Sequence, residues 1–96
     1  MNQVFQREVE SALITFVQEH EEILAIDKLN LDGENIEYHL LLKKYPSQRL
    51  SQEFFSFYEN LYRDVSPIKG SYHIMFWPLD LSEDSPREKI YERKAA

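Results

Sequence analysis

The sequence predicts a small α+β protein in which two helices cover one face of a three-stranded antiparallel sheet. Three observations predict this fold. Apolar residues recur at helical spacing in two segments, an Asp-Gly pair separates two apolar runs, and an apolar strand follows the second helical segment. The expected element order is α-β-β-α-β in a two-layer sandwich. We expect one domain over residues 1–80 and a polar tail or short helix over residues 81–96.

The first helix is expected over residues 3–19. Its apolar residues are three and four positions apart, which places them along one stripe of a helix. Ile14 falls outside that stripe. The stripe consists of Val4, Phe5, Val9, Ala12, Leu13, Phe16 and Val17.

A β-hairpin is expected next, because residues 23–31 and 36–44 flank Asp32 and Gly33. A loop of two or four residues gives the same assignment of side chains to faces, and the two-residue loop places Lys28 opposite Glu37. One face then holds Ile23, Ala25, Leu29, Ile36, Tyr38, Leu40 and Leu42, and the other holds Leu24, Ile26, Lys28, Glu37, His39 and Leu41.

The second helix follows the strand-breaking Tyr45-Pro46-Ser47, with Ser47 or Ser51 as its N-cap. Residues 66–70 end this helix. Phe55 and Tyr62, seven positions apart, are expected to widen its apolar stripe on one flank. The stripe consists of Leu50, Phe54, Phe57, Tyr58, Leu61 and Val65.

The last strand, residues 71–77, is apolar on both faces. Tyr72, Ile74 and Phe76 alternate with His73, Met75 and Trp77, the only tryptophan. We expect the first three to face the helices, although no turn fixes this choice. The other sheet face would then expose a cluster of large apolar side chains, which indicates a partner. The expected partner-binding residues are Leu24, Ile26, Leu41, Met75 and Trp77.

The C-terminal segment offers an alternative cover for that face through Ile90 and Tyr91. Ser85-Pro86 is typical of a helix start, so a short helix is expected over residues 86–94, or else a frayed tail.

Composition excludes several classes of function. The net charge of −6 argues against nucleic acid and anionic membranes as partners. Five glutamates and one arginine in residues 1–22 indicate a solvated helix face or attraction to a basic partner. The absence of cysteine, of a signal peptide and of a membrane-spanning run predicts a cytoplasmic protein.

The sequence contains no motif for catalysis or for a cofactor, so we expect a protein that is not an enzyme and binds no cofactor. Two glycines are too few for a phosphate-binding loop. His39 and His73 are the only candidates for metal ligands, since both could lie on one sheet face. No third ligand has a suitable spacing, so no metal site is expected.

The order α-β-β-α-β, the run His39-Leu40-Leu41-Leu42 and the ending Phe76-Trp77-Pro78 resemble the cytosolic C-terminal domain of cation diffusion facilitators. The resemblance implies a ferredoxin-like fragment that dimerises. It argues against metal sensing, because only His39 matches a histidine that this family uses for metal, and Met75 stands where another histidine would be expected.

Two functions remain open from the sequence. The first is a non-enzymatic, acidic protein-binding module (an adaptor, inhibitor or immunity-type protein), which self-associates or binds another protein through the outer sheet face. The alternative is a small regulatory domain that senses a metal or small ligand through the sheet histidines.

Overall fold

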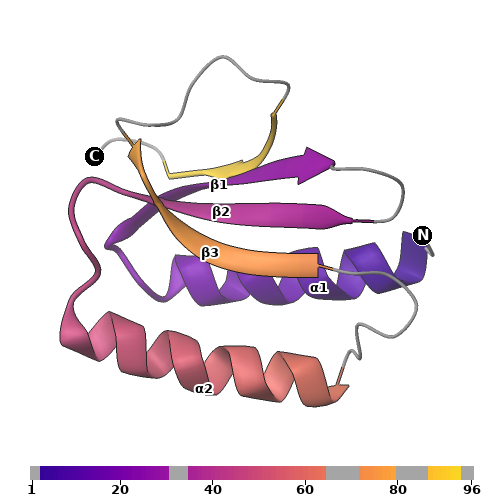
Figure 1. Ribbon diagram of the computed structural model, residues 1–96, viewed down its shortest axis with the longest axis horizontal. Coiled ribbons are helices and arrows are strands. Elements are labelled where there is room, and N and C mark those ends of the chain that lie inside the picture. Colours follow the sequence, from indigo (N-terminus) through magenta and orange to yellow (C-terminus); the bar gives the residue numbers. More distant parts are fainter. Residues whose placement is uncertain (1–2, 31–34, 65–71, 80–86, 94–96) are drawn as a thin grey trace.

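The computed structural model describes residues 3–30, 35–64, 72–79 and 87–93. They form an α+β fold whose elements are α1 (Gln3–Gln18), β1 (Ile23–Asn30), β2 (Ile36–Leu42), α2 (Gln48–Asp64), β3 (Tyr72–Pro78) and β4 (Glu88–Glu92). Figure 1 shows both helices on the same side of the sheet. The predicted class and the order of the first five elements are confirmed. The predicted turns at residues 32–34 and 66–70, and Val65, lie outside the described residues.

The predicted three-stranded antiparallel sheet is wrong. The sheet has four strands in the order β3-β2-β1-β4, and β2 and β3 run parallel. The length of α2 gives the reason. Its 17 residues span about 25 Å, and the seven residues of β2 span about 23 Å, so the helix returns the chain to the level where β2 begins. β3 therefore starts beside the start of β2.

The hairpin between β1 and β2 is confirmed, but its register differs by one residue from the predicted one. Asn30 pairs with Ile36, so Lys28 lies opposite Tyr38 and not opposite Glu37. Because alternate residues of a strand point to opposite faces, this shift places most side chains of β1 on the face of the sheet opposite to the predicted one. The residues that the prediction placed on the wrong face are Ala25, Ile26, Lys28 and Leu29.

A register irregularity between Ile23 and Ala25 compensates for the shift. The extra residue, Leu24, lets both Ile23 and Ile26 face the helices, where both are fully buried. The core lies between the sheet and the helices and follows the predicted faces of β2 and β3. Its buried members are Val9, Leu13, Phe16, Val17, Ile23, Ile26, Ile36, Tyr38, Leu40, Leu42, Leu50, Leu61, Tyr72 and Ile74.

Lys28 is accommodated at the margin of this core by polar groups of α1. Its Nζ lies 2.9 Å from Glu10 Oε2 and donates to Gln6 Oε1 at 3.2 Å. Tyr38 Oη donates to the same Glu10 oxygen at 2.8 Å. Burial, together with the bond to Glu10, raises the pKa of Tyr38. The ammonium is thus paired and hydrogen-bonded, as a buried charge requires.

The start of α2 is fixed by the predicted cap. Ser47 Oγ accepts the backbone N–H of Leu50 at 3.1 Å and donates to Glu22 Oε1 at 2.5 Å, while the Ser47 backbone N–H donates to Glu22 Oε2 at 3.0 Å. These bonds lower the pKa of Glu22. One turn along α2, a hydrogen bond from His20 Nε2 to Glu53 Oε2 at 2.7 Å lowers the pKa of Glu53. The two carboxylates join the loop after α1 to the first turns of α2.

The short helix expected over residues 86–94 is also wrong, because Glu88–Glu92 is a strand that pairs antiparallel with β1. Ile90 and Tyr91 are partly buried against the core, at the far edge of the sheet from β3. In the described part of the chain, neither helix is long and apolar enough to cross a membrane.

Arg93 holds the end of β4 against the end of α1. Its guanidinium donates to the backbone carbonyls of Val17, His20 (3.2 Å) and Ile23 (3.2 Å), and its backbone N–H donates to the carbonyl of Leu24 at 2.8 Å. The last carbonyls of a helix lack partners within the helix, and a cation placed there also suits the helix dipole.

We therefore expect Arg93→Ala to lower the free energy of unfolding by about 2 kcal/mol, and the melting temperature by about 10 °C, because buried carbonyls lose a charged donor. Thermal and urea denaturation measure the effect. Lys89→Ala is the control, because Lys89 is exposed and pairs only with Glu92 among the described residues. Equal stability of the two variants would contradict this role for Arg93.

Stability should also fall in acid because of Glu22 and Glu53. Each folded pKa lies below the ordinary value of 4.5, so the folded state gains stability above that pH and loses it as the pH falls through the folded pKa values. Melting temperatures measured between pH 6 and pH 3 should fall less steeply in Glu22→Gln/Glu53→Gln than in the natural sequence. Glu59→Gln is the control, because Glu59 is exposed. If the melting temperature of the double variant fell as steeply in acid as that of this control, Glu22 and Glu53 would be excluded as the cause of the loss of stability.

Candidate functional site

The outer face of the sheet, opposite the helices, carries a buried polar cluster. Asp27 of β1 and His39 of β2 are register partners, and they are only 3% and 2% exposed. Arg87, which immediately precedes β4, reaches both: Nη1 lies 3.7 Å from Asp27 Oδ2 and donates to His39 Nδ1 at 3.1 Å. Arg87 thus connects β1 and β2 to the start of β4.

Both ring nitrogens of His39 are engaged. A guanidinium only donates, so Nδ1 is the acceptor and the ring proton lies on Nε2, which donates to Glu37 Oε1 at 3.0 Å. Trp77 stacks on the ring with a centroid separation of 4.3 Å, and the Arg87 guanidinium lies 5.9 Å from the centroid of the Trp77 ring.

This geometry does not favour metal binding by the two candidate ligands, His39 and His73. His39 would have to break a hydrogen bond to bind a metal ion. His73 lies on β3 opposite Glu37 and is exposed, two residues along from Met75, the register partner of His39. Among the residues that the structure describes, no three His, Asp or Glu side chains converge in the way that a metal ion requires.

The five residues predicted to bind a partner do not form one surface. Ile26 faces the helices, and its assignment to the outer face was wrong. Leu41 does lie on the outer face but is fully buried. Leu24 is half-buried at the irregularity of β1. Met75 and Trp77 remain partly exposed, side by side on the outer face of the edge strand β3.

α2 carries a set of aromatic side chains on the flank that packs against β3. Phe55 is 65% exposed and Tyr62 is 36% exposed, whereas both were expected to widen a buried stripe. Phe54 packs on Phe76 of β3 with ring centroids 4.7 Å apart, so aromatic packing joins the helix to the strand. We call this the β3–α2 surface and define it as Phe55, Tyr58, Tyr62, Met75, Phe76 and Trp77.

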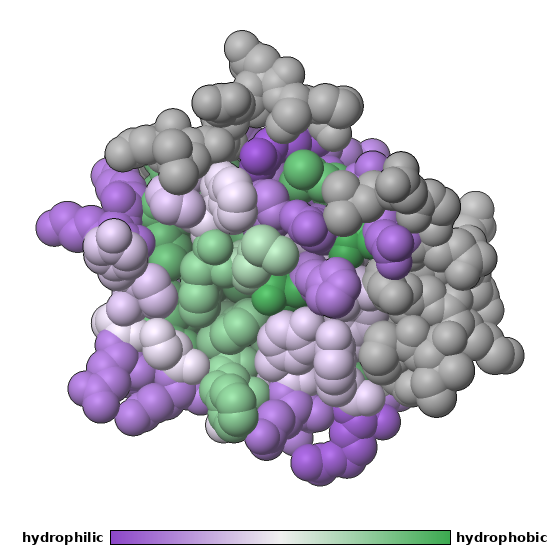
Figure 2. All heavy atoms as spheres, in the orientation of Figure 1, coloured by the Kyte–Doolittle hydropathy of each residue, from purple (hydrophilic) through white to green (hydrophobic). Residues whose placement is uncertain are grey.

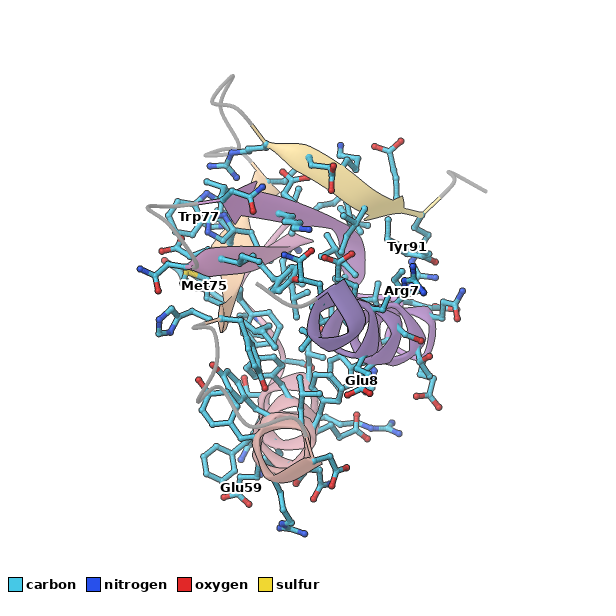
Figure 3. All side chains as sticks on the ribbon, turned by 90° about the vertical axis from the view of Figure 1, so that its right-hand side faces the viewer. Arg7, Glu8, Glu59, Met75, Trp77 and Tyr91 are labelled. Atoms are coloured by element: carbon cyan, nitrogen blue, oxygen red, sulfur yellow. The ribbon has the colours of Figure 1, made fainter. Side chains whose placement is uncertain are left out.

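The figures show this surface from two directions. Figure 2 shows hydrophobic side chains gathered on the face that β3 turns to the viewer, from the sheet down to α2. Figure 3, turned by 90°, shows Met75 and Trp77 on that same side of the molecule. A sequence signal for the α2 part did exist, since Phe55 and Tyr62 interrupt an otherwise polar helix flank.

The edge of β3 is partly occupied by α2. Tyr62 Oη donates to the backbone carbonyl of Tyr72 at 3.3 Å, and Tyr58 Oη donates to Tyr62 Oη at 3.0 Å. The backbone N–H of Ile74 in turn forms a hydrogen bond to the Tyr58 hydroxyl. Burial raises the pKa of Tyr58 and of Tyr72. Tyr72 C=O and Ile74 N–H are groups that a further strand would pair, so the two hydroxyls stand in for part of that strand.

We expect Asp27→Asn and Arg87→Gln each to lower the free energy of unfolding by about 3 kcal/mol, because each leaves buried partners poorly compensated. The double variant should lose less than the sum, since neither charge then remains. Urea denaturation followed by the emission of Trp77, the only tryptophan, measures the coupling. Strictly additive losses would show that the two charges do not interact.

No significant match to this chain is found among family models, curated proteins or solved structures. The resemblance to the cation diffusion facilitator domain therefore gains no support from these comparisons. What the chain does has to be inferred from its own surfaces.

Proposed function

We propose that this protein is a non-enzymatic protein-interaction module that self-associates through the β3–α2 surface. The observation that carries the proposal is the exposure of Phe55, at 65%, on α2, together with the partly exposed Met75 and Trp77 on β3, the strand against which α2 packs. Water-exposed aromatic groups that form a continuous patch are costly unless another molecule covers them. Trp, Tyr, Phe and Met are also the residues enriched at the centres of protein interfaces.

The shape of the surface favours a protein over a small ligand. Its side chains come from a helix and from the edge strand of a sheet, and Phe55 is 65% exposed to solvent. Small-molecule sites are concave and bury most of their ligand. A projecting aromatic side chain suits insertion into a partner.

The distribution of charge favours a second copy of the chain as that partner. The exposed Lys43 and Lys44 lie beside Trp77 and Pro78 at the end of β3. The last two turns of α2 hold the exposed Glu59 and Asp64 with the exposed Arg63 between them in sequence. Figure 1 shows the ends of β2 and β3 on the left of the molecule and the end of α2 on the right, because α2 and β3 run in opposite directions. Two copies related by a two-fold axis across β3 would bring the basic end of each to the acidic end of the other.

The proposal predicts that Phe55→Glu converts a dimer into a monomer. A buried, unpaired charge at the centre of the interface opposes association. Sedimentation velocity should give twice the 11.5 kDa chain mass for the natural sequence, and 11.5 kDa for the variant at the same concentration. Far-UV circular dichroism should be unchanged, since Phe55 is mostly exposed.

Gln18→Glu is the matched control, because it adds the same charge at an exposed position at the end of α1. It should remain dimeric. A monomeric natural protein at about 100 μM, well above the Kd of specific interfaces, would refute self-association. A Phe55→Glu variant that stays dimeric would show that copies associate through another surface.

A further inference from the structure

A groove lies between α1 and α2, on the other flank of α2 from Phe55. It consists of two adjoining hollows, both lined by Phe16, Glu19 and Phe57. The rings of Phe16 and Phe57 stack at 4.5 Å and form its floor together with Ala12 and Leu61. The groove is thus apolar at its base, and it follows helices of 16 and 17 residues.

The rim of the groove is acidic. It is lined by two arginines, Arg7 and Arg49, and by the six carboxylates of Glu8, Glu19, Glu21, Glu22, Glu53 and Asp64. Glu22 and Glu53 are held by Ser47 and by His20 and Arg49. Within the described ranges, no ion pair engages Glu8, Glu19, Glu21 or Asp64, all of which are exposed. Figure 3 shows Glu8 on the side of α1 that faces α2.

We propose that this groove binds a basic amphipathic α-helix of a partner protein. The apolar floor between two helices suits the apolar stripe of a third helix, as in other helix-in-groove complexes. The carboxylates along both walls suit lysine or arginine on the flanks of that stripe. A helix of four turns spans about 22 Å and matches the 24 Å or so of α1. This proposal uses different side chains from the β3–α2 surface and does not depend on self-association.

The probe for this site is a fluorescein-labelled peptide of about 18 residues, with leucines at helical spacing i, i+3, i+4 and i+7 and lysines on both flanks of the leucine stripe. Titration of the full chain, followed by fluorescence anisotropy, should show saturable binding at physiological salt. Glu8→Lys/Glu19→Lys should weaken binding about tenfold or more, because Glu8 on α1 and Glu19, directly after α1, both line the groove and change sign together.

The control variant is Glu59→Lys, which changes one exposed carboxylate of α2 that does not line the groove, and it should weaken binding less than twofold. Far-UV circular dichroism confirms that each variant is folded. Phe55→Glu should bind the peptide like the natural sequence, which separates this proposal from the proposed dimer.

Two further peptides test the chemistry of the occupant. A scrambled peptide of the same composition, without an apolar stripe, should bind at least tenfold more weakly, and a peptide with glutamate for lysine should not bind. Equal binding of the scrambled peptide would show non-specific attraction of charge and would overturn the proposal. If Glu59→Lys and Glu8→Lys/Glu19→Lys weakened peptide binding equally, the proposal would be overturned as well.

Discussion

The parallel pairing of β3 with β2 is the constraint on which the rest of the structure depends. The two strands share the level at which they begin, so the chain between them must return along the sheet, and α2 provides that return. α2 consequently lies alongside β3, where its aromatic side chains meet those of the strand. The pairing also leaves β3 at the edge of the sheet, where β2 is its only neighbour among the described strands. An all-antiparallel sheet would not leave β3 and α2 side by side in this way.

Polar contacts, more than apolar burial, hold the last strand in place. β4 has five residues, and none of its side chains is fully buried. Arg87 at its start reaches Asp27 and His39, and Arg93 at its end reaches the carbonyls that follow α1. Because guanidinium groups stay charged and present several donors in one plane, one side chain satisfies several buried acceptors at once. A short edge strand with little apolar surface is thereby fixed at both ends.

The sequence was sufficient to predict α1, α2 and the hairpin of β1 and β2, because the spacing of apolar residues and the Asp-Gly pair are local signals. It also assigned the faces of β2 and β3 correctly, since Tyr38, Leu40 and Ile74 lie in the core. The face of β1 was not predictable from that pattern. Leu24, Ala25 and Ile26 are consecutive apolar residues, so the pattern does not show which of them face the helices. The irregularity in β1, which lets both Ile23 and Ile26 face the helices, determines this.

The candidate site was predictable in part for the same reason. Met75 and Trp77 follow from alternation along β3, whereas Phe55 and Tyr62 look like members of a buried helix stripe until the width of the sheet is known. Ile26 was placed in the patch because the predicted register assigned it to the wrong face of β1. Leu41 was placed there because the sequence gives no sign that Arg87 and the polar cluster occupy the outer face. Contacts between residues 48 positions apart, such as Arg87 with His39, cannot be predicted from the spacing of neighbouring residues in the sequence.

The two proposed surfaces share α2 but use different flanks of it. Phe55 and Tyr62 lie on one flank, and Glu53, Ser56 and Asn60 line the acidic groove on the other. This separation matters electrostatically, since a chain of net charge −6 repels its own copies. Association through the β3–α2 surface would leave Glu8, Glu19, Glu21, Glu22 and Glu53 outside the contact, where salt screens them, whereas Asp64 would meet the basic end of the second copy. The acidic flank of α2 then stays open to a basic partner while the aromatic flank meets a second copy.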